Sequence, residues 1–183
     1  MGTDFTVAVT PDTNPPTGTV ALNDGAVFTT SDTVLLSNSI TDDSSGVSDM
    51  LIDTGNGWGS WLTYTTMAIL GLPGGEGVKT VRVQFRDAVG NTSPVYSDSI
   101  ALGTPISIAQ AKAGPLSFLV LSGVDVSAIF ADHIYVEQPD RSGGIRIVGT
   151  SGLNVGDRVD IAGALSQAIG ESFVNAVLSA YQR

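Results

Sequence analysis

Asp87 and Asn91 belong to the segment RDAVGN (86–91), which follows the alternating run KTVRVQF and precedes another such run. Carboxylate and amide oxygens are ligands that a hard metal ion accepts. The same side chains also accept hydrogen bonds from the backbone amides of a tight turn, and Gly90 can adopt the positive φ that such a turn needs. Because turn chemistry accounts for every residue of the segment, we interpret it as the corner of a hairpin.

A second acidic segment, TDDSSGVSD (41–49), supplies Asp42, Asp43 and Asp49 together with several hydroxyl groups. Calcium takes several oxygen ligands, and such a loop offers carboxylates, hydroxyls and carbonyls. The spacing lacks the glycine and the terminal glutamate of an EF-hand loop. We therefore expect a solvated acidic loop and no cofactor, with calcium binding by these three aspartates as the alternative.

Both tryptophans of the chain, Trp58 and Trp61, lie in GNGWGSWLTY (55–64), which ends at Tyr64. The face of an aromatic ring is a flat apolar surface on which a sugar ring can stack. Side chains alternate between the two faces of a strand, so the three rings cannot share one face of a strand. We expect at least one of them in the core. A carbohydrate-binding surface using Trp58, Trp61 or Tyr64 is the alternative.

The residue types give little support for catalysis. His133 is the single histidine, it follows Asp132, and no nucleophile-elbow pattern is present. The chain has no cysteine, so a lone histidine cannot complete a zinc site. Glu137 and Glu171 could in principle act as a carboxylate pair, but no pattern places them across a cleft. We expect a protein that is not an enzyme.

The second half of the chain has a few residues that could contact nucleic acid: Tyr135, Arg141, Arg146 and Arg158. Proteins bind single strands through basic grooves and stacked aromatic rings. The formal net charge is −10, from 8 Lys and Arg against 18 Asp and Glu, and the arginines are interleaved with aspartates. We expect no nucleic-acid binding, and single-stranded binding through this half is kept as a further alternative.

The elements that must position these residues are short strands joined by turns. Of the 183 residues 22 are glycine, 42% of the chain is hydrophobic and only 14% is charged. Before Leu102, seven short runs are separated by turn segments such as NDGA and PGGEG, which predicts an antiparallel sandwich. Residues 11–18 (PDTNPPTG) are typical of a linker, and residues 5–9 are expected to be an edge strand or the end of a preceding unit.

After Leu102 the pattern changes. ISIAQAKAG predicts a short helix near residues 106–113, ended by Gly114 and Pro115. The long run FLVLSGVDVSAIF and four shorter ones predict a small barrel. We therefore expect residues 1–103 to form the sandwich with its N-terminal linker and residues 104–183 to form the barrel. No apolar stretch approaches the roughly 18 residues of a membrane span.

The segments NPPTGTVALNDGA, TDDSSGVSDM, GWGSW, GVKTVRVQFRDAVGN and YSDSIAL give about residues 14–102 a resemblance to a bacterial immunoglobulin-like repeat of large secreted multidomain proteins. About residues 105–183 resemble an OB-fold module of exported bacterial proteins. That likeness is carried by SIAQAKAG, LSGVDVSAIFADHIYVEQPDRSGGIRIV, NVGDRVDIAGAL and ESFVNA. The resemblances imply an all-β chain, an immunoglobulin-like sandwich followed by a small OB-like barrel with one short helix, and they supply no catalytic residues.

These resemblances imply a non-catalytic structural or interaction role at an extracellular or cell-surface location. The expected partners are neighbouring domains of a larger protein or further copies of the chain, which could associate through exposed strand edges. The alternatives are a carbohydrate-binding accessory module that takes a polysaccharide and single-stranded nucleic-acid binding by the OB-like half.

Overall fold

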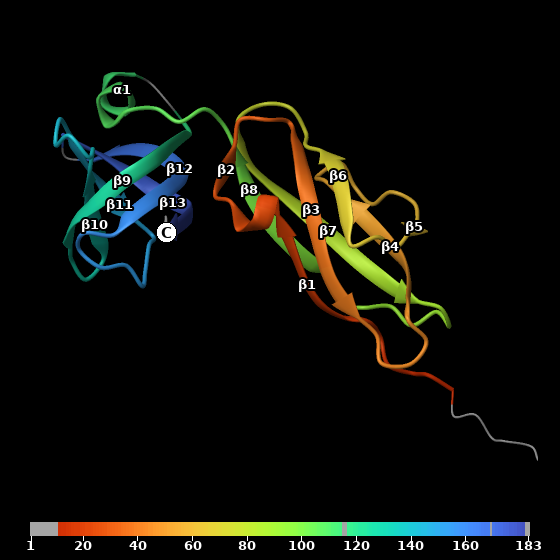
Figure 1. Cartoon of the computed structure of the whole chain (residues 1–183). Helices are drawn as coiled ribbons and strands as arrows, with labels where there is room; N and C mark the ends of the chain where they lie inside the picture. Colours follow the sequence, from red (N-terminus) through yellow and green to blue (C-terminus); the bar gives the residue numbers. More distant parts are fainter. Residues whose placement is uncertain (1–10, 115–116, 169, 182–183) are drawn as a thin grey trace, which may run out of the picture.

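The computed structural model describes residues 11–114, 117–168 and 170–181, so the strand expected at residues 5–9 lies outside the described part. Within it, nearly all regular structure is β strand, and the strands form a sandwich of two sheets followed by a closed barrel (Figure 1). One short α-helix precedes the barrel. The all-β class predicted from the sequence is confirmed.

The sandwich contains strands β1 to β8. Its smaller sheet has the order β1-β3-β6 (Thr17–Leu22, Thr33–Thr41 and Met67–Gly71). Its larger sheet has the order β2-β8-β7-β4-β5 (Phe28–Thr29, Tyr96–Leu102, Gly77–Asp87, Val47–Asp53 and Leu62–Thr63). A 3-10 turn, η1 (Asn23–Gly25), follows β1. Each of the seven predicted runs overlaps one of these strands, and the two-residue β2 is the strand that the pattern missed.

The alternation along β7 decides which side chains face the sandwich core. Val81, Val83 and Phe85 are at most 1% exposed and pack in the same core as Leu22 and Leu36 of the opposite sheet. The residues between them on β7 therefore point to the outer face of the larger sheet. This face receives the charged side chains that are described below.

The barrel closes because β9 pairs with both β10 and β12. The strand order is β10-β11-β13-β12-β9 (His133–Glu137, Gly144–Val148, Glu171–Tyr181, Arg158–Ala168 and Leu119–Ile129). The β11–β13 pair is parallel, and the other neighbouring pairs are antiparallel. The barrel predicted from the five runs is confirmed, and its closure adds what periodicity could not show.

The helix α1 (Ile108–Ala113) lies at one end of the barrel (Figure 1). It begins with a capping box, in which the Ser107 hydroxyl accepts from the Gln110 amide and the Gln110 side chain accepts from the Ser107 amide. Ile108 and Ala111 are fully buried in the barrel core. The helix is therefore held by its apolar face and covers the end of the barrel.

Sandwich and barrel meet through a third apolar cluster, which we call the junction. Val27 and Ala101 come from the sandwich, and Val120 and Ala162 come from the barrel. In the connecting segment the amide of Gly103 donates to the Thr29 carbonyl at 3.0 Å. Further along, the amide of Ile106 donates to the Val120 carbonyl of β9 at 3.0 Å, so the connection is tied to both units. No helix in the described part of the chain is long and apolar enough to cross a bilayer.

Candidate functional site

The hairpin corner at Asp87 is built as the sequence predicts. Asp87 is 2% exposed, and its Oδ1 accepts from the amides of Val89, Gly90 and Asn91 at 3.0, 2.6 and 2.8 Å. Its Oδ2 accepts from the Asn91 side chain at 2.7 Å. Burial raises the pKa of Asp87, but the hydrogen bonds from Asn91 and Gly90 outweigh it and hold the pKa below its ordinary value. The interpretation as a hairpin corner is confirmed.

The same corner takes part in a group of carboxylates that the sequence did not bring together. Asp12, Asp42 and Asp87 each offer an oxygen, and these oxygens lie within 4.8 Å of one another. The Oδ2 of Asp42 is buried and has no hydrogen-bond partner. Among the described residues, these are the ones that could hold a hard cation such as calcium.

The structure does not bring together the three aspartates that were the alternative calcium ligands. Asp42 lies in the carboxylate group, whereas Asp43 is exposed and accepts from the Asn14 side chain at 3.1 Å. Asp49 points from β4 to Arg86, whose Nη2 lies 2.7 Å from its Oδ2. Asp12 was missed because it lies in the predicted linker, and only the fold brings that linker beside two loops.

The outer face of the larger sheet carries two similar clusters of side chains. Each cluster consists of an aspartate, an arginine and a tryptophan. Asp53 of β4 pairs with Arg82 of β7, and the guanidinium lies 5.3 Å from the centre of the Trp58 ring. Further along the same two strands, Asp49 pairs with Arg86, whose guanidinium lies 4.5 Å from the centre of the Trp61 ring. In each cluster the tryptophan ring lies over the arginine of the ion pair, and this cation–π contact itself stabilises the cation.

The three aromatic residues predicted as a sugar platform are therefore divided. Trp58 and Trp61 share the outer face, and Trp58 is 39% exposed. Tyr64 instead packs against the core, with its ring edge-on to Phe85 at 5.9 Å and its hydroxyl donating to the Ile40 carbonyl at 3.4 Å. The expectation of one core residue among them fits Tyr64. Since each tryptophan already has an arginine on one face, at most the opposite face of each ring is free to stack on a sugar.

A second polar and aromatic surface lies on the barrel, on the outside of β10, β11 and β13. Strand register places Tyr135 beside Arg146 and Arg146 beside Phe173, in one row across three strands. The Tyr135 hydroxyl donates to Glu171 at 2.8 Å, and an Arg146 amino group lies 3.7 Å from the same carboxylate. The Arg146 guanidinium lies 4.6 Å from the centre of the Phe173 ring.

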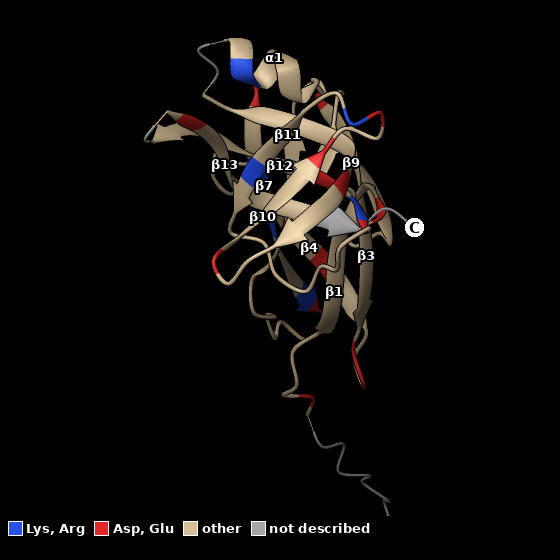
Figure 2. Cartoon of the chain, turned by 90° about the vertical axis from the view of Figure 1, so that its left-hand side faces the viewer, with Lys and Arg blue, Asp and Glu red and all other residues tan. Residues whose placement is uncertain are grey.

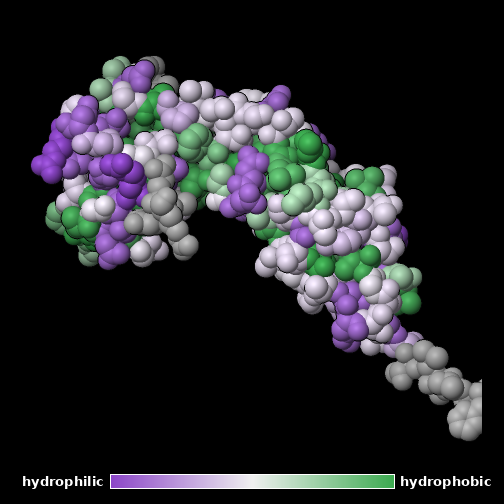
Figure 3. All heavy atoms as spheres, in the orientation of Figure 1, coloured by the Kyte–Doolittle hydropathy of each residue, from purple (hydrophilic) through white to green (hydrophobic). Residues whose placement is uncertain are grey.

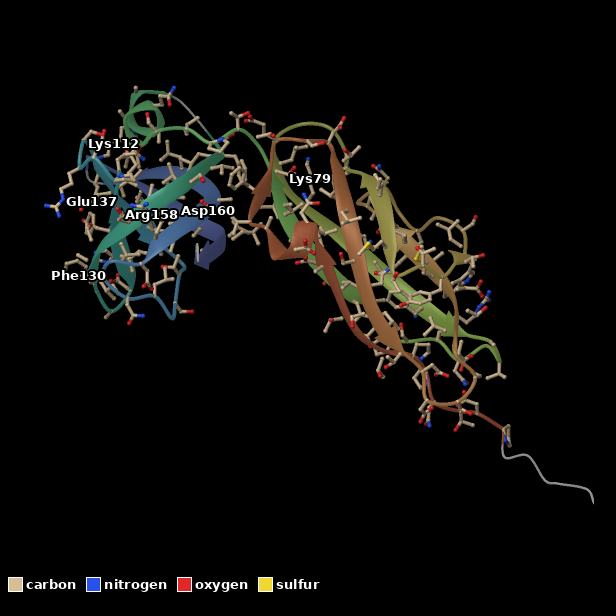
Figure 4. The ribbon with its side chains drawn as sticks, viewed as in Figure 1. Lys79, Lys112, Phe130, Glu137, Arg158 and Asp160 are labelled. Carbon is tan, nitrogen blue, oxygen red and sulfur yellow. The ribbon has the colours of Figure 1, made fainter. Side chains whose placement is uncertain are left out.

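Phe130 and His133 extend this row at the loop between β9 and β10. Phe130 is 54% exposed, and its ring stacks on His133 with 4.7 Å between centres. A hollow of about 320 Å³ opens beside them, lined also by residues 149–153. Figure 4 shows Phe130 on the side of the barrel turned away from the sandwich. We call these residues the barrel face: Phe130, His133, Tyr135, Arg146, Glu171 and Phe173.

The barrel face carries both a positive group, Arg146, and a negative group, Glu171. The hydrogen bond to Glu171 is the main cause that raises the pKa of the Tyr135 phenol. Nε of Arg146 is buried without a hydrogen-bond partner. Figure 2 shows both acidic and basic positions along the ribbon of the barrel, with no continuous run of basic ones in this view.

The other two arginines considered for nucleic acid are engaged by carboxylates. Arg158 forms a two-pronged pair with Asp125 at 2.8 and 3.0 Å, and Arg141 lies 3.7 Å from Glu137. These four residues line a hollow of about 690 Å³ at the side of the barrel. Its charges therefore offset one another instead of forming a basic groove.

Most members of the barrel face are candidates from the sequence in separate roles, whereas Phe130 and Phe173 are not among those candidates. Tyr135, Arg146 and Glu171 were considered for nucleic acid or for acid–base chemistry, and the fold places them on one surface. The alternation in HIYVE and GIRIV could have placed Tyr135 and Arg146 on the outside of their strands. Phe173 could not be added, because β13 joins β11 through a pairing between distant segments.

No protein-family model and no curated protein matches this sequence. Among solved structures, the chain is similar to one described as the structural basis for the promiscuous specificity of the carbohydrate-binding modules from the β-sandwich superfamily. The TM-score is 0.43 at 13% sequence identity, and the match covers 83% of this chain and 85% of the other. A likeness this distant carries no argument about function.

Proposed function

We propose that this chain is a non-catalytic carbohydrate-binding module of an exported bacterial protein, and that the barrel face is its saccharide site. The observation that carries the proposal is the continuous surface from the exposed Phe130 ring to the row of Tyr135, Arg146 and Phe173. Such a surface combines a flat apolar ring with hydrogen-bonding groups on rigid strands.

The chemistry of the barrel face suits a ligand rich in hydroxyl groups. The exposed Phe130 ring supplies a stacking surface for the apolar side of a sugar ring. The Glu171 carboxylate accepts hydrogen bonds, and the Arg146 guanidinium donates them in a fixed fork. These groups hold one another through the contacts at 2.8 and 3.7 Å, so little conformational freedom remains to be lost on binding.

The strand order favours the same surface. Five-stranded barrels of the OB type bind oligonucleotides and oligosaccharides on the face of their second and third strands and the adjoining loops. In this barrel those strands are β10 and β11. Near the face, Glu171, Asp132 and Glu137 stand against Arg146 and Arg141, so the charge does not favour a polyanion. A neutral saccharide is therefore the better ligand class.

Affinity electrophoresis through gels that contain single soluble polysaccharides tests this function. We expect at least one neutral polysaccharide to retard the wild-type chain. Phe130→Ala should weaken the retardation at least about fivefold, because it removes the stacking surface. Arg146→Ala should weaken it as well. Because Phe130 is 54% exposed, its replacement should leave the thermal unfolding curve unchanged.

Trp58→Ala is the matched control, since it removes an exposed aromatic ring from the sandwich. Retardation that survives Trp58→Ala and is lost in Phe130→Ala supports the barrel face. The reverse pattern would move the site to the sandwich and contradict this assignment. Retardation by none of the polysaccharides, or salt-sensitive binding of labelled single-stranded DNA in a polarisation titration, would overturn the proposed function.

A further inference from the structure

The edge strand β6 of the smaller sheet leaves a row of backbone groups open. On its inner side β6 pairs with β3 from Thr33 opposite Gly71 to Ser37 opposite Met67. The Leu72 amide donates to the Asp32 carbonyl and the Asn38 amide donates to the Thr66 carbonyl. In an antiparallel ladder the residues that exchange hydrogen bonds alternate along each strand. The backbone N–H and C=O groups of the even-numbered residues of β6 therefore point toward β3. The backbone groups of Met67, Ile69 and Gly71 therefore point away from the sheet.

The opposite edge of the smaller sheet, β1, is partly covered. The β1 edge is met by side chains from β8, because the Leu22 amide donates to Asp98 at 2.7 Å and the Gly18 amide donates to the Tyr96 hydroxyl at 3.3 Å. The edges of the larger sheet are the two-residue strands β2 and β5. The barrel is closed. Within the smaller sheet, β6 therefore offers the more open edge.

Nothing along β6 protects this edge. Natural edge strands carry charged residues, prolines or bulges that prevent pairing with another chain. The sequence MAILG has none of these, and its register with β3 is continuous. Ile69 is 79% exposed and Met67 is 63% exposed, which places two large apolar side chains beside the open backbone. Figure 3 shows apolar atoms gathered on this part of the sandwich, where β3 and β6 lie.

We propose that β6 pairs with β6 of a second copy of the chain, antiparallel and centred on Ile69. This register makes Ile69 face Ile69 of the other copy across a two-fold axis, and it sets Met67 opposite Gly71. The long Met67 side chain then meets a residue without one, so the seam is complementary to itself. No charge enters the seam, although each copy carries a formal net charge of −10.

The pairing should be weak and should depend on concentration. Two five-residue strands bury less than the roughly 1,200 Å² of a stable interface, and the net charges of the copies repel. The Met67 carbonyl also accepts from the Thr65 hydroxyl at 2.8 Å, which leaves it one further lone pair for a partner amide. The inference concerns the sandwich and is independent of saccharide binding by the barrel face.

Oxidative cross-linking tests both the surface and the register. The chain has no cysteine, so Ile69→Cys introduces a single thiol. In the proposed register the two Cα atoms lie about 5.5 Å apart, within the range of a disulfide. We expect mild oxidation to convert most of this variant to a covalent dimer. Val89→Cys, at a hairpin position that is also exposed (61%), should cross-link at least about tenfold more slowly.

Sedimentation equilibrium gives a second measurement on the protein without a thiol. The wild-type mass should rise with concentration from 18.8 kDa toward that of a dimer, and Ile69→Lys should stay monomeric while Val89→Lys behaves as wild type. A wild-type chain that remains a monomer at millimolar concentration would refute the inference. So would dimers that persist in Ile69→Lys, or equal cross-linking at the two cysteine positions.

Discussion

Two carboxylates, Asp53 and Asp49, link β4 to β7 on the outer face of the larger sheet, and their ion pairs with Arg82 and Arg86 require the ionised form. Asp53 is fully buried and accepts from the amides of Gly55 and Gly57 at 2.7 and 2.9 Å while it pairs with Arg82. The hydrogen bond from Gly55 is the main cause that lowers its pKa, followed by Arg82. The side chain of Arg86 lowers the pKa of Asp49 in the same way.

These carboxylates predict a loss of stability in acid. A carboxyl group whose pKa is lowered by folding stabilises the native state above its unfolded pKa, about 3.9, and this contribution disappears as the pH falls through the folded value. We expect the urea midpoint of unfolding, followed by tryptophan fluorescence, to fall between about pH 5 and pH 2. Asp53→Asn should lower the midpoint at pH 7 and make the fall in acid shallower.

Asp24→Asn, at an exposed position of the turn after β1, is the matched control for the same change of charge. An acid profile of Asp53→Asn with the wild-type slope would show that Asp53 does not contribute through its ionisation. Equal effects of the two variants at pH 7 would assign the loss to net charge instead of to the buried network.

The residue scale also shows what spacing along the chain could not predict. The alternation rule showed only that the three rings cannot share one strand face, and it did not single out Tyr64 as the core residue. Trp58 and Trp61 precede β5 in a loop, where no period applies, and their position follows from Arg82 and Arg86 on a distant strand. Contacts between a loop tryptophan and an arginine on a distant strand depend on the tertiary structure. The sequence can therefore name candidate aromatic residues but cannot show which residues they contact.

Within the elements, the barrel depends on one close approach between β12 and β13. The register of this pair shifts between Ala162 and Gly163, and a Cβ atom on Gly163 would lie 2.1 Å from the Asn175 carbonyl oxygen. Only a residue without a side chain fits this approach. The glycine is therefore part of how β12 bends to close the barrel.

Gly163→Ala should destabilise the barrel by about 1–3 kcal/mol, because the backbone of β13 must move to admit the methyl group. Circular dichroism during urea unfolding measures this loss. Gly74→Ala is the control, since nothing lies within 4 Å of a Cβ there. A midpoint of Gly163→Ala equal to that of Gly74→Ala would show that the strands separate without cost.

Element existence was predictable and element pairing was not. Alternating runs such as KTVRVQF and turn segments such as PGGEG mark strands locally, and the run ISIAQAKAG, ended by Gly114 and Pro115, marks the helix. The two-residue β2 is too short to show a period. The order of the strands depends on contacts between segments far apart, such as β11 with β13, and one sequence holds no direct signal for them.

At the level of the whole molecule, sandwich and barrel have separate cores and share the junction. Val27 belongs to the junction and to neither of the two larger cores. It is 7% exposed and lies between η1 and β2. A change at Val27 therefore weakens the coupling between the units and leaves both cores intact.

Val27→Asp should separate the unfolding of the two units. Both tryptophans lie in the sandwich, so their fluorescence reports that unit, whereas circular dichroism reports both. We expect the two signals to coincide in wild type and to diverge in Val27→Asp, because a buried unpaired charge is costly. Val89→Asp, an exposed position, should leave them coincident. Coincident signals in Val27→Asp would mean that the junction does not couple the units.

The place of β13 in the barrel has a consequence for the time order of folding during synthesis. All sandwich strands precede residue 103, so this unit can fold while later residues are still being added. β13 is the last barrel strand in sequence, and it lies between β11 and β12. Until it leaves the ribosome, β11 and β12 each have one unpaired edge. The nascent barrel therefore stays open until its final strand arrives, and a chaperone that shields strand edges would act during this interval.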